Sequence, residues 1–398
     1  MMIPLLFWPS VAMILYVYFG YPILLGVLAS LRPKPRAYPN HTPRVTLLIA
    51  AYNEAEVITQ KLQNTVLLDY PREKLQILVA ADGSTDETAN IVSGYQGRSV
   101  ELSYSPERHG KMAAINNAMA KARGEIIVMS DANNLYSPQT IKELVKPFYI
   151  PEIGAVSGAK HIIEGDGRLG ESEGLYWNYE AWIKEQETRL GCCTAVSGEI
   201  YAFRSKLYAP PPDEIINDDF YMLMNIVKKG YRAVYVPEAQ SYERISLTSQ
   251  DEIERRTRMV AGRFQAIALA GKLLPSNRPL IVWQVISHKF MRPLIPFAMM
   301  LMFVTSVLSV FWPASPSSPI WMLTNPYNWI LFLSQLLFYF IAWLGNYVSL
   351  PKVLYLPTFL VNSNLAAFLG LIRFITRRQD TLWKRAKRRE DIAPTGAR

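Results

Sequence analysis

Apolar positions along this chain fall into two patterns, short runs bounded by polar turns and long stretches without charge. The short runs lie between residues 43 and 249, where runs of this kind predict buried strands. The predicted strands are 44–51, 75–81, 99–104, 125–130, 195–204 and 231–236. Helical stretches separate most of them, at 55–67, 111–121, 175–190 and 220–229. Strands that alternate with helices predict an α/β domain over residues 40–249, with a doubly wound, mostly parallel sheet.

The long uncharged stretches predict helices that cross a membrane. Residues 1–30 contain no charged side chain and exceed the ~20 apolar residues that span a bilayer. They lack the short apolar core and cleavage site of a secretory signal, so we expect an uncleaved anchor over residues 1–31. Three further apolar segments, 294–312, 327–345 and 353–372, predict a C-terminal membrane region at 293–374. Transmembrane helices are therefore expected on both sides of the α/β domain.

The net charge is +9, and the basic residues flank the apolar stretches. Arg32, Lys34 and Arg36 follow the first stretch, and residues 375–398 form a basic tail. Basic flanks are typical of the cytosolic side of membrane segments. We therefore expect a multi-pass protein of the cell inner (plasma) membrane whose α/β domain and tail are cytosolic. The same distribution argues against nucleic-acid binding, which would favour a basic patch on the soluble domain itself.

The sequence allows more than one position relative to the membrane for two segments. Residues 250–292 are basic and amphipathic, with Ile253, Val260, Phe264 and Ile267 spaced to share one face. This segment either rests on the membrane surface or is a surface helix of the α/β domain. Residues 353–372 contain a proline and the polar run 362–364 at their middle. If they crossed the membrane the basic tail would lie outside, so we predict that they lie at the interface or re-enter.

The two cysteines, Cys192 and Cys193, are adjacent in sequence. They provide no disulfide framework for an oxidising compartment. We expect them to be small residues in or near a core.

Polar side chains stand at the ends of two predicted strands. Asp131 and Asn133 follow the strand at 125–130, and Asp82 follows the strand at 75–81. Ligands of open α/β sheets bind at the carboxyl ends of the strands, so we expect these side chains to line one site. Mg²⁺ and Mn²⁺ prefer oxygen ligands, often few from protein, which makes Asp131 the candidate metal ligand. Asn133 either adds a carbonyl oxygen to such a cation or is a turn residue.

Other polar residues also have two interpretations each. Asp82 either accepts hydrogen bonds from a ribose or base, or stabilises an Asx-turn before Gly83. Lys111 either pairs with a diphosphate or is an ordinary surface lysine. Asp219 is the candidate general base, with Asp218 beside it, because a neighbouring like charge raises the pKa of a carboxyl group. Paired acids ahead of a helix are also common caps.

Six motifs occur in an order that resembles one enzyme family. They are Ala50-Ala51-Tyr52-Asn53-Glu54, Ala81-Asp82-Gly83-Ser84-Thr85-Asp86, Gly110-Lys111, Ser130-Asp131-Ala132-Asn133, Val196-Ser197-Gly198-Glu199 and Asn217-Asp218-Asp219. With residues 230–239, they resemble the inverting family 2 glycosyltransferases, which have a GT-A fold. The resemblance covers residues 44–265, and the flanking membrane segments are similar to those of the cellulose synthase-like branch.

The resemblance implies roles at the matched positions. Nucleotide contacts are implied for Ala51, Asn53, Glu54 and Asp82. Asp131 would hold the metal and the diphosphate. Gly198 would lie beside the acceptor pocket, and Asp219 would be the general base.

The chain departs from the family pattern in two places. Processive members carry Gln-x-x-Arg-Trp where this chain has Arg255-Arg256-Thr257-Arg258-Met259. The three arginines are either diphosphate contacts or a solvated or lipid-facing basic face. Because the glutamine and tryptophan are missing, we predict one or a few sugars added per encounter rather than a long polymer. Asn133 stands where many members have a second aspartate.

The expected function is transfer of a hexose or N-acetylhexosamine from a nucleotide sugar, with UDP as the nucleotide. The acceptor would be a polysaccharide or a lipid-linked sugar at the cytosolic membrane face, and the cofactor Mg²⁺ or Mn²⁺. Two alternatives stay open, a polyisoprenyl-phosphate glycosyltransferase and a catalytically silent membrane protein that binds sugars as a receptor or scaffold. Intact Asp131 and Asp219 argue against the silent protein. Few apolar segments, without paired charges, argue against a transporter.

Overall fold

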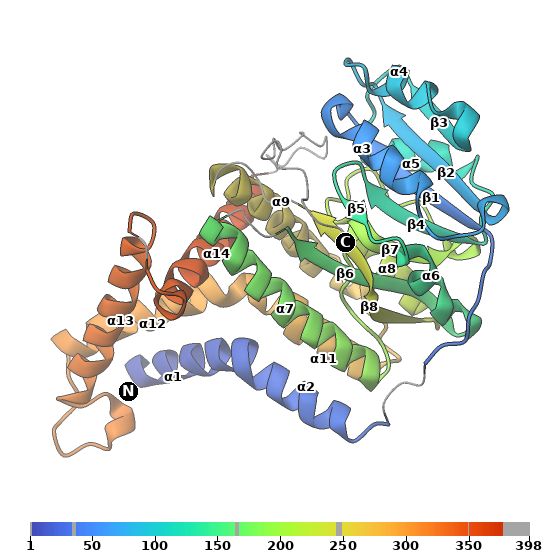
Figure 1. Ribbon diagram of the computed structural model, residues 1–398. Helices are drawn as coiled ribbons and strands as arrows, with labels where there is room; N and C mark the ends of the chain where they lie inside the picture. The colour runs from blue at the N-terminus through green and yellow to red at the C-terminus, as the bar shows by residue number, and fades with distance from the viewer. Residues whose placement is uncertain (1, 34–36, 164–166, 244–248, 349, 377–398) are drawn as a thin grey trace. The chain divides into compact units, whose positions relative to one another are not determined.

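The computed structural model describes residues 2–33, 37–163, 167–243, 249–348 and 350–376 (Figure 1). Lys34, Arg36 and the basic tail beyond residue 376, whose charges entered the topology prediction, lie outside these ranges. The chain divides into two compact units. Among the described residues, a helical unit combines 2–24, 253–267 and 283–376, and an α/β unit combines those of 25–252 and 268–282.

One sheet of eight strands forms the centre of the α/β unit, within the ranges just given. Its order is β3-β2-β1-β4-β7-β6-β8-β5. The strands are β1 (Val45–Ala51), β2 (Leu75–Asp82), β3 (Val100–Ser105), β4 (Ile126–Asp131), β5 (Leu135–Tyr136), β6 (Ile153–Ile162), β7 (Tyr201–Arg204) and β8 (Arg232–Glu243). The first four pair in parallel, β7 runs antiparallel to β4 and β6, and β8 is parallel to β6. The expected α/β class is confirmed, with a mixed sheet beyond β4.

Helices cover the sheet, which explains its apolar strands. Every residue of β1 and β2 is buried, as a parallel sheet covered on both faces requires. The helix α5 (Lys111–Met119) packs against β1, β2 and β3. The helices α6 (Thr140–Val145), α7 (Gly167–Leu190) and α8 (Asp218–Lys228) pack against β6 and β8. Two further helices, α3 (Ala55–Val66) and α4 (Thr88–Ser93), contact each other.

One stretch of the sheet differs from the prediction. Residues 195–204 were expected as a strand, but 195–200 form a loop and a short 3-10 turn, η5 (Gly198–Ile200), before β7 begins. β6 was not predicted, because glycines at 154 and 158 interrupt its apolar pattern. A Cβ atom at Gly158 would lie 2.4 Å from Cδ1 of Ile200. This glycine therefore allows η5 to approach the sheet closely.

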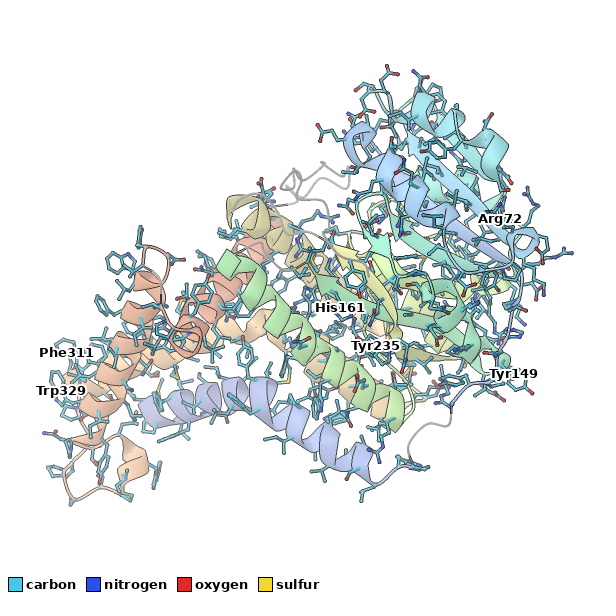
Figure 2. The ribbon with its side chains drawn as sticks, viewed as in Figure 1. Arg72, Tyr149, His161, Tyr235, Phe311 and Trp329 are labelled. Carbon is cyan, nitrogen blue, oxygen red and sulfur yellow. The ribbon has the colours of Figure 1, made fainter. Side chains whose placement is uncertain are left out.

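Four helices in the described ranges are long and apolar enough to cross a membrane: Met2–Ser30, Pro279–Phe311, Tyr327–Leu344 and Leu354–Ile375. The first joins α1 (Met2–Leu15) to α2 (Tyr21–Ser30) through a π-helical turn. The second contains α11 (Pro279–Val285) and α12 (Ile295–Phe311), and the others are α13 (Tyr327–Leu344) and α14 (Lys352–Ile375). In the helical unit α1 and α13 pack against α12. Phe311 and Trp329 lie at the same end of the α12–α13 pair (Figure 2). The expected membrane helices at both ends of the chain are confirmed.

The last segment is one unbroken helix. α14 has 24 residues, and a re-entrant segment would have to turn back within this length. The prediction that residues 353–372 re-enter is therefore wrong, because the proline and the polar run do not interrupt the helix. An interfacial position for α14 stays a prediction.

Residues 253–267 of the amphipathic segment pack within the helical unit, and residues 268–282 belong to the α/β unit. The long helix of the segment is α9 (Ser249–Ala268), followed by α10 (Ala270–Leu273). Val260 and Phe264 form a core cluster with Ala367 of α14, and Ile267 packs against this cluster. A Cβ atom at Gly370 would lie 2.8 Å from Cβ of Val260, so the two helices cross closely. Part of this apolar face is covered by α14, and the position of the segment relative to a membrane stays a prediction.

Candidate active site

The carboxyl ends of β1, β2 and β4 bring three loops to one edge of the sheet. The parallel register pairs Ala51 with Ala81 and Ala50 with Asp131, so these strands end at the same level. Ala51 is buried as the last residue of β1. The loops that carry Asn53, Asp82 and Asp131 therefore start from neighbouring positions. This is the edge at which open α/β sheets bind their ligands.

Asn53 and Glu54 join the first loop to the second. Asn53 has a φ of 54°, a left-handed conformation that asparagine tolerates better than most residues. Its side-chain oxygen accepts a hydrogen bond from the backbone N–H of Thr85 at 2.8 Å. The backbone N–H of Glu54 donates to Thr88 Oγ1 at 2.8 Å, and the Glu54 side chain is buried. Both predicted nucleotide contacts thus shape the loops that would hold a nucleotide.

Asp82 binds the loop before α5. Its two carboxylate oxygens accept hydrogen bonds from the backbone N–H groups of His109 at 2.9 Å and Gly110 at 2.7 Å. The next residue, Gly83, has a φ of 58°, and a Cβ atom there would lie 2.6 Å from the backbone nitrogen of Arg108. Neither sequence interpretation anticipated this arrangement. Asp82 holds the start of α5 and thereby sets the position of Lys111.

The candidate metal residue and the candidate diphosphate residue are ion-paired. Lys111 Nζ lies 2.9 Å from Asp131 Oδ1, and each side chain is about a quarter exposed. The side-chain oxygen of Asn133 is buried and has no hydrogen-bond partner among the described residues. An orphaned carbonyl oxygen two residues from a carboxylate is a donor set that fits a Mg²⁺ or Mn²⁺ ion.

Protein side chains alone would not complete such a metal site. In the described part of the chain, no group of three or more His, Cys, Asp or Glu side chains is placed to hold a metal ion. Mg²⁺ commonly keeps waters and binds through one or two carboxylates together with substrate phosphates. The residues present therefore fit a cation that arrives with a diphosphate.

A buried lysine lies beneath this turn and was missed by the sequence analysis. Lys61 of α3 is fully buried, and its Nζ donates to Ser130 Oγ at 2.7 Å and to the carbonyl oxygen of Asn134 at 2.8 Å. Burial lowers the pKa of Lys61 to about 7, against the opposing attraction of Asp131 and Glu199. One signal was available, because position 61 shares the buried face of α3 with apolar residues.

The acceptor-side motifs meet beside the candidate base. A Cβ atom at Gly198 would lie 3.6 Å from Cβ and 3.7 Å from Oδ2 of Asp219. Asp218 and Asp219 begin α8, where the helix dipole favours a negative charge. The buried hydroxyl of Tyr201 has no hydrogen-bond partner in the described chain. Burial, with added repulsion from Asp219 and Asp218, raises the pKa of Tyr201 well above its ordinary value.

Glu199 belongs to a buried ion-pair cluster that the sequence did not suggest. Lys160 Nζ lies 2.7 Å from Glu199 Oε2 and also pairs with Glu243. All three side chains are less than a tenth exposed. The three residues come from β6, η5 and β8, so only the folded sheet brings them together. His161 of β6 and Tyr235 of β8 lie in the same part of the α/β unit (Figure 2).

The three predicted arginines belong to the helical unit. Arg256 donates to Ser363 Oγ at 2.5 Å and lies 5.1 Å over the ring of Phe359. Burial lowers its pKa to about 10. Arg255 lies 3.6 Å from the sulfur of Met259, the residue at the tryptophan position of the family motif. These contacts show what holds the arginines within their own unit, and diphosphate binding by Arg255, Arg256 and Arg258 stays a prediction.

The similarity to family 2 glycosyltransferases is confirmed for the α/β unit. Residues 46–206 match the model of "Glycosyl transferase family 2". The chain is 26% identical over 247 residues to poly-beta-1,6-N-acetyl-D-glucosamine synthase of Staphylococcus aureus strain COL, covering 60% of this chain and 59% of that protein. It is 24% identical over 303 residues to "Probable glycosyltransferase YdaM" of Bacillus subtilis strain 168, covering 70% of each.

The fold is shared with a solved transferase. The mannosyltransferase PcManGT from Pyrobaculum calidifontis, solved in complex with GDP-Man and Mn²⁺, aligns with a TM-score of 0.69 and 24% identity. The alignment covers 94% of this chain and 100% of that chain.

Proposed function

We propose that this chain, whose residues 46–206 carry a glycosyl transferase family 2 domain, transfers a sugar from a nucleotide sugar to a glycan or lipid-linked acceptor. One observation carries the proposal. Antiparallel pairing of Met129 with Tyr201 brings the end of β4, with Asp131, beside η5, with Gly198. The candidate diphosphate residue thus lies on a strand beside η5, and Gly198 of η5 borders the candidate base Asp219 of α8.

The roles follow from the chemistry of each group. The loops of Asn53, Asp82 and Gly83 form the nucleotide side of the site, with Ala51 and Glu54 beneath them. Asp131 and Asn133 would hold Mg²⁺ or Mn²⁺, and such a cation supplies positive charge to the leaving diphosphate. Lys111, which already contacts Asp131, lies where it can shift to a phosphate oxygen.

Asp219 is proposed to accept the proton of the acceptor hydroxyl. A general base must be negatively charged before the reaction, and the N-terminal end of α8 favours that state. Gly198 leaves the space beside Asp219 free of a side chain, which supports an acceptor group at this position. An inverting transfer needs one such base, and we assign Asp218 a supporting electrostatic role.

The relatives support part of the substrate assignment. The staphylococcal relative is named as a synthase of an N-acetyl-D-glucosamine polymer, and the solved mannosyltransferase contains a nucleotide sugar and Mn²⁺. We therefore propose an N-acetylhexosamine or hexose donor on UDP, and a divalent cation as cofactor. The four long apolar helices support a multi-pass protein of the inner membrane, with the α/β unit on the cytosolic side where nucleotide sugars are made.

Native membranes containing the full chain provide the direct test. They would be incubated with single nucleotide sugars in Mn²⁺ or Mg²⁺, and both release of the nucleotide and labelled glycan would be measured. We expect nucleotide release from one UDP-sugar, with the label in a glycan or lipid-linked glycan. Label in a polyisoprenyl phosphate would support the alternative transferase. No release from any donor, with binding retained, would support the silent sugar-binding protein and refute the proposal.

A further inference from the structure

Lys61 carries a fully buried amino group that the proposed chemistry does not use. Its Nζ donates to Ser130 Oγ at 2.7 Å, to the Asn134 carbonyl oxygen at 2.8 Å and to Asn134 Oδ1 at 3.2 Å. It also lies 4.4 Å from the centre of the Tyr136 ring. Lys61 forms no ion pair with a carboxylate of the described chain. A buried amino group without such a partner is costly unless it is hydrogen-bonded, so its contacts with Ser130 and Asn134 are what stabilise it here.

Asn134 connects this lysine to the other side of the site. Its side-chain oxygen accepts from Lys61 and lies 3.1 Å from Ser130 Oγ. Its side-chain nitrogen donates to the carbonyl oxygen of Glu199 at 3.1 Å and to Ser241 Oγ at 2.7 Å. Asn134 itself is fully buried. Its side chain therefore uses both ends, one toward α3 and β4 and the other toward η5 and β8.

The two turns that this asparagine joins are the two halves of the proposed site. Asn134 follows Asn133, the candidate metal ligand, and Glu199 follows Gly198, which lies beside Asp219. The Tyr136 hydroxyl also reaches the Glu199 carbonyl oxygen at 2.7 Å. Asn134 thus joins the metal-side turn 131–134 to the acceptor-side turn 198–200, and the Tyr136 hydroxyl supports the same carbonyl oxygen.

We propose that Lys61 and Asn134 are positioning residues that fix the separation between the metal-side turn and the acceptor-side turn. The inference rests on the proposed function, because it assigns these turns to the leaving group and to the acceptor. A displacement of 1 Å between reacting groups costs about 10²-fold in rate. A rigid connection between the turns would therefore affect turnover more than nucleotide binding.

Two variants test separately the hydrogen bonds of Lys61 to the metal-side turn and those of Asn134 to Glu199 and Ser241. Lys61→Met removes the ammonium group that holds Ser130 and Asn134. Asn134→Asp keeps an oxygen for Lys61 but removes both N–H donors to Glu199 and Ser241. Thr46→Val is the matched control, because Thr46 is fully buried and donates to Gln76 at 2.7 Å, at the opposite end of β1.

The full chain in detergent would be examined by hydrogen exchange with mass spectrometry, by titration of UDP in Mn²⁺, and by transfer assay. In Lys61→Met, we expect faster exchange in both 130–136 and 197–201. In Asn134→Asp, we expect faster exchange in 197–201 alone and a fall of about 10- to 100-fold in kcat, the usual cost of losing an outer-shell partner. UDP affinity of Asn134→Asp should stay close to that of wild type, because the nucleotide-side loops keep their own hydrogen bonds. Thr46→Val should leave both segments and kcat unchanged.

Three results would overturn the inference: unchanged exchange at 197–201 in Lys61→Met, unchanged exchange there in Asn134→Asp, or an unchanged kcat in Asn134→Asp. Should Lys61→Met not accumulate, Asn134→Asp decides alone. If wild type neither binds nor cleaves a nucleotide sugar, the proposed function fails, and the exchange data still decide whether the two turns are coupled.

Discussion

Replacing Lys111 with methionine should change the affinities for Mn²⁺ and for UDP in opposite directions. In the free protein Lys111 neutralises Asp131 at 2.9 Å. Without the ammonium group, the Asp131 carboxylate is able to bind a cation, and no neighbouring positive charge from residue 111 repels that cation. With a nucleotide bound, the same lysine would contact the diphosphate, so its loss should weaken nucleotide binding.

The magnitudes follow from the exposure of the pair. Two unit charges at ~4 Å interact by ~1 kcal/mol in water and ~4 kcal/mol at an effective dielectric constant of ~20. Because each side chain is about a quarter exposed, the value should lie near the lower limit. We expect binding of Mn²⁺ alone to tighten by about threefold to tenfold. A charged hydrogen bond contributes ~1.5–3 kcal/mol, so UDP affinity in saturating Mn²⁺ should fall by about tenfold or more.

Two titrations measure these changes. Free Mn²⁺ would be followed by its paramagnetic signal in the absence of nucleotide, and UDP binding by calorimetry at saturating Mn²⁺. Lys142→Met is the control, because Lys142 pairs at 2.5 Å with the exposed Asp69 outside the proposed site, and neither affinity should change. Weaker binding of Mn²⁺ alone, or an unchanged UDP affinity, would refute the assignment of Lys111 to both partners.

Three further outcomes are expected. Asp131→Ala should lose the Mn²⁺ dependence of UDP binding and Asn133→Ala much less, because only the carboxylate is charged; equal losses in the two titrations would show that both side chains ligate comparably. Burial raises the pKa of Cys192 to about 11 and that of Cys193 further, so the folded protein at pH 8 holds both as thiols, and a disulfide reagent should label them only after unfolding; rapid labelling of the folded protein would contradict the buried position. With Met259 at the tryptophan position, products sized under acceptor excess should carry one or a few added sugars, whereas long chains beside unused acceptor would contradict this expectation.

The sequence predicted best those strands whose residues are buried in an unbroken run. β1, β2 and β4 are apolar runs because both faces of a parallel sheet are covered, so their ends could be located within a residue or two. β6 was missed because Gly154 and Gly158 interrupt its apolar pattern. At both positions a side chain would collide with neighbouring residues, so glycine allows close packing. Chain order alone also did not reveal that β7 reverses direction beside β4.

The polar residues of the site were only partly predictable, for a related reason. Residues such as Asp131 and Asp219 stand next to apolar runs, so their position along the chain is informative. The connections of Lys61, Lys160 and Glu199 join elements far apart in sequence, so a local pattern, such as the place of Lys61 on the buried face of α3, does not identify their partners. Asp82 was expected to face a ligand or its own turn, yet it binds the loop before α5, a contact that depends on the pairing of β2 with β3.

The re-entrant prediction for residues 353–372 failed because it assumed that a polar run at the middle of the segment would interrupt the helix. Asn362-Ser363-Asn364 would be unfavourable facing lipid. In the folded chain, Ser363 accepts a hydrogen bond from Arg256, and Asn364 donates to the Tyr18 hydroxyl at 3.2 Å. Neighbouring helices thus satisfy the polar run, and α14 continues through it.

Single-turnover transfer by Asp219→Asn tests the central claim most directly, with UDP affinity in Mn²⁺ measured on the same preparation. Loss of a general base lowers the rate by ~10²–10⁴-fold, and UDP affinity should stay close to that of wild type. Asp213→Asn, an exposed aspartate on the loop before α8, should behave as wild type. A transfer rate within a factor of a few of wild type in Asp219→Asn would contradict the account, because the amide of asparagine cannot take up the acceptor proton as a carboxylate does.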